Sequence, residues 1–118
     1  MILIGNDIVD IAKFEKIYLN YKDRFISRIF NSDEIKYCKS KNNPILHFSG
    51  KFAAKEAVKK TFSTNVYFKD ISILNKINGK PFAKIVGSEN CKIDVSVSHT
   101  DDYATAVAIN YVKNNDIY

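Results

Sequence analysis

Residues 48–60 read FSGKFAAKEAVKK, a pattern typical of a helix with one buried side. Asn43 is a favourable N-cap for such a helix, and Pro44 suits its first position. The apolar residues recur once per turn along one row: Ile45, Phe48 and Phe52. Glu56 is the next residue in that row. We therefore predict a long helix over residues 44–60 in which the Glu56 carboxylate is at least partly buried.

The charge of Glu56 needs a partner. A carboxylate taken out of water is stable only when it is paired, hydrogen-bonded or bound to a cation. Lys60 lies one turn further on and is one candidate; on a helix surface such a pair contributes only about 0.2–0.5 kcal/mol. The spacing leaves open whether Glu56 forms this ordinary ion pair or has a chemical role.

Composition indicates a globular protein with an anionic partner. The chain has 118 residues, of which 46% are hydrophobic and 13% aromatic, and we expect one domain over residues 1–118. The net charge of +5 and the isoelectric point near 9.1 favour binding to nucleic acid, an anionic membrane, a phosphorylated cofactor or an acidic protein. A plain excess of lysine explains the charge equally well.

Cysteine usage and the chain ends favour the cytoplasm. Cys38 and Cys91 lie far apart and outside any C-x-x-C pattern, so neither a zinc site nor a redox pair is indicated. The apolar run of residues 1–4 is too short for a signal peptide or a membrane span. We expect a cytoplasmic protein without membrane association, and a loose polar tail over residues 113–116.

The order of predicted elements defines an α+β fold. It begins with a short buried strand over residues 2–4. The predicted helices are residues 11–21, a capping-box helix from Asn31 and Glu34 to about residue 41, and residues 44–60. The predicted later strands are residues 66–68, 71–74, 82–86, 93–100 and 103–112. With Asn78-Gly79 as a hairpin turn, we expect one N-terminal strand, about three helices and a mainly antiparallel sheet.

Asp7 follows the predicted first strand. Gly5 permits a sharp backbone path before it, and Asp10 is positioned to cap the next helix. A carboxylate just beyond a strand end is often near a ligand in α/β proteins, although such an Asp is more often a turn or cap residue.

Several segments together resemble one family. Residues 50–57, GKFAAKEA, resemble the G-R-F-A-A-K-E-A signature of the holo-[acyl-carrier-protein] synthases, the small 4′-phosphopantetheinyl transferases. Three further segments match motifs of the same family. Residues 4–10, IGNDIVD, match its G-I-D-I-V-E motif, and residues 79–81, GKP, match its G-K-P motif. Residues 95–100, VSVSHT, match its V-S-[IL]-S-H-T motif. Their order and the short chain make the resemblance specific.

The resemblance implies a reaction. The 4′-phosphopantetheine of coenzyme A would pass to a serine of an apo acyl carrier protein, leaving adenosine 3′,5′-bisphosphate. Asp7 and Glu56 would hold Mg²⁺, which prefers carboxylate, phosphate and water oxygens. Lys60 is placed to neutralise charge on the departing phosphate. Glu56 is our candidate base for the serine proton, directly or through a bound water.

The resemblance also implies a coenzyme A site. Its residues would be His99, Thr100, Lys80, Gly79, Pro81 and Lys51. Lys51 stands where the family has Arg, so a bidentate phosphate contact is not expected there. By pattern alone His99 lies on the apolar face of its strand, as a core histidine does, and the Gly79 turn needs no ligand.

Basic residues near the N-terminus are candidates for docking the carrier protein. In the resembled family, basic side chains of this region bind the acidic carrier, a role that would fall to Lys13, Arg24 and Arg28. A solvated basic face is the other interpretation. The family works as a homotrimer with active sites between subunits, and Asp33 is an outside candidate near a neighbouring subunit's site.

Three alternatives stay open. A nucleic-acid-binding module would explain the positive charge and aromatic content, but it has no use for paired Asp7 and Glu56. A carrier-binding subunit without catalysis is disfavoured by intact Asp7, Glu56 and Lys60. A transferase of the same type that serves a different carrier protein has no sequence feature against it. We expect no nucleic acid partner.

Overall fold

Strand β1 (Ile2–Asp10) pairs along its whole length with the last strand, β5 (Tyr103–Tyr111). The structure, a computed structural model, describes residues 1–88 and 90–112. The strand predicted over residues 2–4 is therefore too short, because pairing continues to Asp10. Asp7 lies within the strand and not beyond its end. The tail predicted to be loose lies outside the described residues.

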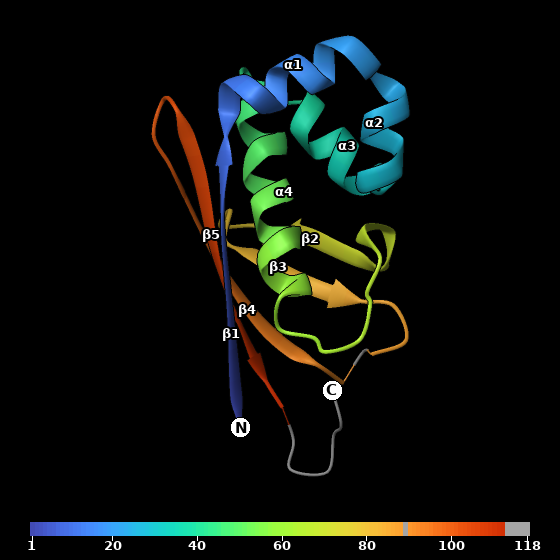
Figure 1. Ribbon diagram of the computed structural model, residues 1–118, viewed down its shortest axis with the longest axis vertical. Coiled ribbons are helices and arrows are strands. Elements are labelled where there is room, and N and C mark those ends of the chain that lie inside the picture. The colour runs from blue at the N-terminus through green and yellow to red at the C-terminus, as the bar shows by residue number, and fades with distance from the viewer. Residues whose placement is uncertain (89, 113–118) are drawn as a thin grey trace.

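In the described residues four α-helices follow β1: α1 (Ile11–Tyr21), α2 (Asp23–Ile29), α3 (Ser32–Lys39) and α4 (Pro44–Lys59). Helices α1, α2 and α3 gather at one end of the molecule, and α4 runs from there along the sheet (Figure 1). The sequence predicted α1, α3 and α4 but missed α2. Lys22 separates α2 from α1 and has a positive φ of 44°. This conformation is uncommon for lysine, so the sequence does not predict the break between the two helices.

The predicted helix starts are confirmed by their capping contacts. The Asp10 carboxylate accepts a hydrogen bond from the Lys13 N–H at 3.2 Å, which starts α1. The Asn43 side chain accepts from the Leu46 N–H at 3.3 Å, which starts α4. Each contact satisfies one N–H that the first turn of a helix leaves unpaired.

The strands form one antiparallel sheet in the order β1-β5-β4-β3-β2. The remaining bounds are β2 (Ile71–Asn75), β3 (Pro81–Ile85) and β4 (Lys92–His99). The predicted hairpin joins β2 to β3, and Gly79 adopts a positive φ of 88° in its turn. The strand predicted over residues 66–68 is wrong. Phe68–Asp70 is a 3₁₀ turn, and the Phe68 ring packs on Phe52 of α4 with ring centroids 5.6 Å apart.

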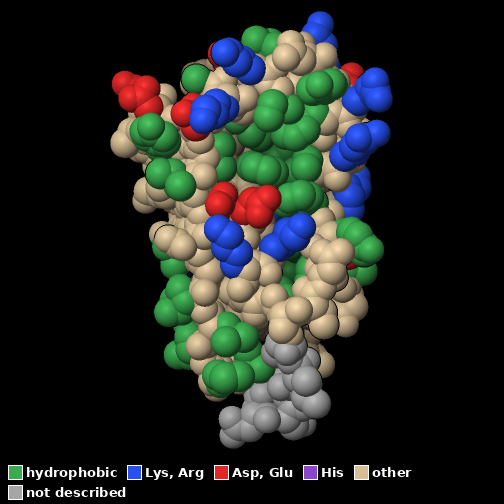
Figure 2. Space-filling model, in the orientation of Figure 1, with side chains coloured by type: hydrophobic (Ala, Val, Ile, Leu, Met, Phe, Trp, Pro, Cys, Tyr) green, Lys and Arg blue, Asp and Glu red, His purple; other side chains and the backbone are tan. Residues whose placement is uncertain are grey.

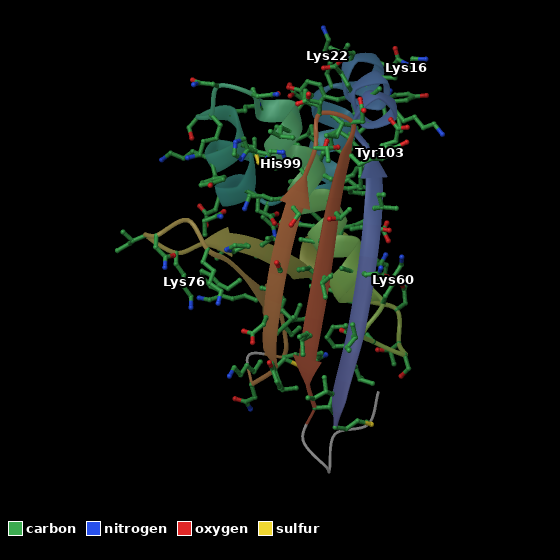
Figure 3. All side chains as sticks on the ribbon, turned by 90° about the vertical axis from the view of Figure 1, so that its left-hand side faces the viewer. Lys16, Lys22, Lys60, Lys76, His99 and Tyr103 are labelled. Atoms are coloured by element: carbon green, nitrogen blue, oxygen red, sulfur yellow. The ribbon has the colours of Figure 1, made fainter. Side chains whose placement is uncertain are left out.

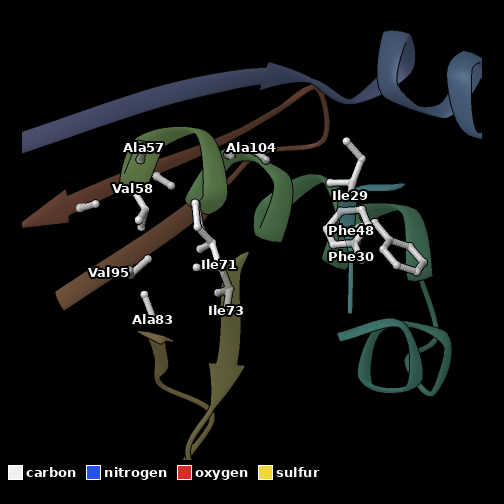
Figure 4. Close-up of a cluster of buried hydrophobic side chains, with 14 of the residues drawn as sticks. Ile29, Phe30, Phe48, Ala57, Val58, Ile71, Ile73, Ala83, Val95 and Ala104 are labelled. Carbon is white, nitrogen blue, oxygen red and sulfur yellow. The ribbon is translucent and has the colours of Figure 1, made fainter. Parts of the chain in front are cut away.

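Helix α4 lies across one face of the sheet and carries much of the core (Figure 4). Its buried small residues Ala53, Ala54 and Ala57 match the small buried residues of β5, Ala104, Ala106 and Ala108. Small side chains on both surfaces let the helix approach the sheet closely. The helical apolar row predicted from sequence is confirmed, with Phe48 fully buried beneath α3 and α2.

A fully buried ion pair joins α3 to α4. Lys55 Nζ lies 2.7 Å from Glu34 Oε1, and neither side chain has any exposed surface. Four backbone groups complete the network at 2.7–3.1 Å: the carbonyls of Ile29 and Phe68 and the N–H groups of Asn31 and Ile73. The bond from Asn31 to Glu34 is the predicted capping-box contact. Because every partner is supplied, two charges can be held without water.

We predict that Lys55→Met lowers the free energy of unfolding by about 3–5 kcal/mol, because it leaves the Glu34 carboxylate buried without a cation. Urea unfolding at pH 7 measures the change. The matched control is Lys39→Met, which removes an ion pair to Asp23 that is exposed on both sides. The control should cost no more than about 1 kcal/mol. Equal losses in the two variants would contradict the importance of the buried pair.

Candidate active site

Asp7, Glu56 and Lys60 line one cavity of about 430 Å³. Asp7 comes from β1, whereas Glu56 lies in the last turns of α4 and Lys60 follows its end. The rest of the wall is largely apolar and includes Phe14, Ile17, Phe25 and Phe52. Figure 2 shows this face of the molecule, where apolar side chains gather beside acidic and basic ones.

The close approach of β1 to α4 brings these residues together. In β1, Gly5, Asp7 and Val9 face the helix because side chains alternate along a strand. A Cβ at Gly5 would lie 2.0 Å from the Ala57 carbonyl oxygen, so only glycine fits. The sequence interpretation of Gly5 as a sharp turn is therefore wrong. Its missing side chain places the strand directly against the helix that carries Glu56.

Lys60 binds Asp7 and not Glu56. Its Nζ lies 3.2 Å from Asp7 Oδ1 and donates to the Asn6 carbonyl at 2.9 Å. The ion pair considered between Lys60 and Glu56 is thus absent, because β1 passes beside the end of α4 and attracts the ammonium. Among the described residues the Glu56 carboxylate has no hydrogen-bond or ion-pair partner. Glu56 is half-buried, as predicted.

The carboxylates of this cavity fit a hard divalent cation. Asp7 and Glu56 offer oxygen ligands, and the half-buried Glu56 charge is uncompensated by the described residues. Asp10, a third carboxylate on the wall, already caps α1. Within residues 1–88 and 90–112, no group of three or more metal-ligating side chains occurs. A magnesium ion held by two carboxylates would therefore complete its coordination with ligand oxygens and water.

Four of the predicted coenzyme A residues line a second cavity, of about 290 Å³: Lys51, Gly79, Pro81 and His99. No Asp or Glu side chain is among its described lining residues. Lys51 is buried, and its ammonium donates to the Ile73 carbonyl and to Asn75 Oδ1. Burial lowers the pKa of Lys51. Any phosphate contact of Lys51 would have to be made beside these two acceptors.

The other two predicted coenzyme residues lie elsewhere. Lys80 lines a neighbouring cavity, which shares Pro81 with the second one. The Thr100 hydroxyl accepts from the N–H groups of Asp102 and Tyr103 at 3.2 and 3.1 Å, so it shapes the turn between β4 and β5. The structure therefore does not bring all six residues to one cavity.

The two cavities share no lining residue. In Figure 3, His99 lies at the end of β4 near the helices, whereas Lys60 lies on the other side of the three front strands. One chain therefore keeps the carboxylate pair apart from the histidine cavity.

The three basic candidates border the first cavity and its neighbour. Lys13 lines the cavity of Asp7, while Arg24 and Arg28 line an adjoining one. Ile17 and Phe25 belong to both, so the two form one apolar groove with a basic margin. Asp33 is exposed in the first turn of α3 and lines none of these cavities.

Sequence reasoning missed the aromatic wall of the groove. Phe14 packs against Phe25 and Phe52, with ring centroids 5.4 and 5.7 Å apart. The helical spacing placed Phe52 on the apolar side of its helix, but it did not show that the three rings surround a hollow. His47 and Tyr37, which line the second cavity, were also missed because they lie outside the matched motifs.

Comparison with known proteins identifies the family. The model of the 4′-phosphopantetheinyl transferase superfamily matches residues 3–108. The holo-[acyl-carrier-protein] synthase of Protochlamydia amoebophila (strain UWE25) is 40% identical over 115 residues, which cover 90% of this chain and 94% of that protein. The chain therefore belongs to the 4′-phosphopantetheinyl transferase superfamily, and the prediction of a transferase enzyme of this kind is confirmed.

Solved structures share the fold. A holo-[acyl-carrier-protein] synthase of Helicobacter pylori in complex with coenzyme A is 31% identical, with a TM-score of 0.81 over 92% of this chain and 100% of that one. One from Bacillus anthracis str. Ames in complex with CoA (3′,5′-ADP) is 30% identical, with a TM-score of 0.80 over 92% and 94%. The predicted α+β fold is confirmed. No helix in the described part of the chain is long and apolar enough to cross a membrane.

We predict that Gly5→Ala moves β1 away from α4 and lowers the free energy of unfolding by about 1–3 kcal/mol or more, because its Cβ would overlap the Ala57 carbonyl. Urea unfolding measures the loss, and a crystal structure of the variant shows the displacement. Gly87→Ala is the control. No atom lies within 4 Å of a Cβ at Gly87, so only the strain of its positive φ is added. A Gly5→Ala protein as stable as the wild type would contradict the close contact.

Proposed function

We propose that the chain is a holo-[acyl-carrier-protein] synthase, which transfers the 4′-phosphopantetheine of coenzyme A to a serine of apo acyl carrier protein. The pairing of Asp7 and Glu56 in one cavity carries the proposal, because these are the two carboxylates of the matched motifs. Relatives named holo-[acyl-carrier-protein] synthase and two solved ones in complex with coenzyme A or its nucleotide part support it.

Asp7 and Glu56 would hold Mg²⁺. The ion, when bound, would neutralise charge on the diphosphate of coenzyme A. The side chains favour this assignment because Glu56 has no partner among the described residues and Asp7 has only Lys60. Lys60 is half-exposed, with 51% of its side chain accessible, so it is free to turn from Asp7 toward a phosphate.

The chain's own residues account for the remaining chemistry. The serine oxygen forms a bond to the phosphorus attached to the pantetheine, and the bond from that phosphorus to the adenosine bisphosphate oxygen breaks. Glu56 accepts the serine proton, since its unpaired carboxylate faces the cavity. Lys60 stabilises the charge that develops on the leaving phosphate. The by-product is adenosine 3′,5′-bisphosphate.

The nucleotide end of coenzyme A would bind in the cavity of His99, Gly79 and Pro81. Its described lining lacks carboxylates, which suits a phosphorylated ligand. Lys80 lines the neighbouring cavity and Thr100 shapes the β4–β5 turn, so both would contribute less than the sequence motifs imply.

A second copy of the chain would complete the site. The carboxylates and His99 line separate cavities, yet a single coenzyme A molecule would have to reach both. The sheet face opposite α4 is open in Figure 3 and carries exposed apolar residues. They are Ile2, Ile4, Ile8, Tyr103, Val107 and Tyr111. We propose that this face packs against other copies in a homotrimer with active sites between subunits.

The apolar groove with its basic margin would receive the acidic carrier protein. Lys13, Arg24 and Arg28 would pair with carrier carboxylates, and the groove floor at Phe25 leads toward Asp7. The arrangement suits more than one acidic carrier, so the carrier is to be found by assay. A cytoplasmic location and a role in lipid synthesis belong to the same proposal.

The transfer itself is tested by intact-protein mass spectrometry. Apo acyl carrier protein incubated with this protein, coenzyme A and magnesium should gain the mass of one phosphopantetheine, and a chelator should abolish the gain. Several apo carriers are tested in parallel. If a folded protein modifies none of them, the proposed function is wrong.

We predict that Asp7→Ala and Glu56→Ala each slow transfer by at least about a hundredfold, because each removes one ligand of the cation. Circular dichroism should show native folding in both. Glu15→Ala is the control, since this exposed carboxylate of α1 lines neither cavity. Wild-type rates in either of the first two variants would disprove the assignment of the metal site.

We predict that Ile4→Asp converts the trimer to monomers and abolishes transfer, because it places a charge among the exposed apolar residues of β1 and β5. Sedimentation equilibrium measures the assembly. Ile77→Asp changes a fully exposed isoleucine in the β2–β3 turn, away from this face, and should leave the trimer intact. A wild-type protein that is monomeric and fully active would rule out the shared site.

A further inference from the structure

Both histidines of the chain line the nucleotide cavity. His47 belongs to α4 and His99 to β4, and the sequence contains no other histidine. The matched motifs account for His99 but not for His47. His47 is half-buried, so its ring is fixed by packing while it still reaches the cavity.

The surroundings of His47 are cationic. The Tyr37 ring meets the His47 ring edge-on, with centroids 6.0 Å apart. Lys41 Nζ and Lys51 Nζ each lie 4.6 Å from the centroid of the same Tyr37 ring. Positive charge therefore gathers around one aromatic side chain at the cavity wall, which has no described Asp or Glu.

The surroundings of His47 favour its neutral form. Burial lowers the pKa of His47, and electrostatic interactions with Lys41, His99 and Lys51 lower it further. These groups and Tyr37 face His47 from every neighbouring element: Tyr37 from α3, Lys41 from the loop after it, Lys51 from α4 itself and His99 from β4. A phosphate dianion in the cavity would reverse the balance, because an adjacent negative charge favours the protonated ring.

We propose that His47 is a phosphate-binding residue of this cavity and takes up a proton from solvent when the nucleotide end of the coenzyme binds. The proposal rests on the proposed function, since that function places the nucleotide there. It assigns the recognition of one phosphate to α4 and α3, beyond the motif residues of β4 and the β2–β3 turn. Nucleotide binding then becomes tighter as the pH falls toward the pKa of His47 in the free protein.

The direct test is an NMR titration of the histidine ring protons. The full-length wild-type protein is titrated between pH 5.5 and 8.5, alone, with saturating adenosine 3′,5′-bisphosphate, and with adenosine as a ligand without phosphate. His47→Gln identifies the two ring signals, since one histidine then remains. We expect the bisphosphate to raise the pKa of His47 and adenosine to leave it unchanged.

Calorimetry provides the second measurement. Wild-type affinity for the bisphosphate should increase from pH 8.5 to pH 6.5, by about tenfold for each unit by which the pKa of His47 in the complex exceeds the lower pH of this range. The range stays above the phosphate's own pKa of about 6. In His47→Gln the affinity at pH 8.5 should be close to that of the wild type, and most of the pH-dependent gain should be lost. Should this variant fail to fold, His99→Gln assigns the two ring signals in the same way, and the NMR titration of the wild type remains the test.

The possible results separate the two proposals. If the wild type binds the bisphosphate and the His47 pKa does not move, the inference is wrong while the proposed function stands. If His47→Gln keeps the full pH-dependent gain, the inference is also wrong. If the wild type binds no bisphosphate at any pH, both the nucleotide cavity and the role of His47 are wrong.

Discussion

The buried ion pair of Glu34 and Lys55 is the constraint on which the helical part of the molecule depends. Both charges are buried away from water, so the protein itself must supply all their hydrogen-bond partners. These partners come from α2, α3, β2 and the 3₁₀ turn. Lys55 immediately precedes Glu56 in α4. The same contacts that satisfy the ammonium therefore fix the rotation of the helix, and the rotation decides that Glu56 faces the groove and not the core.

The second constraint acts from the opposite side of α4. Gly5 lets β1 touch the helix backbone at Ala57, and this contact sets the position of Asp7 beside Lys60. The carboxylate pair is thus built by two rigid elements that are joined through backbone contact. Side-chain flexibility contributes little to the geometry, as the proposed cation site would require.

The sequence predicted what depends on periodicity and on motifs. The long helix, its buried row, the capping box at Asn31 and Glu34 and the β2–β3 turn follow from local chemistry. It failed where tertiary contact decides: Lys22 takes a positive φ, Phe68 leaves the sheet to pack on Phe52, and Lys60 turns to Asp7. The pairing of β1 through Asp10 depends on β5, nearly a hundred residues away, so no local pattern could reveal its length. Nor could spacing show that His47 meets His99 at one cavity.

Helix α4 has no solvent side. All sixteen of its residues, Pro44–Lys59, are buried or half-buried. The sheet, the other helices and the two cavities together surround the helix on every side. Anyone who labels or redesigns this protein must therefore treat the helix as closed to modification. A fluorophore, a spin label or a solubilising charge belongs on exposed positions such as Lys36 or Lys84, where a new group meets only water.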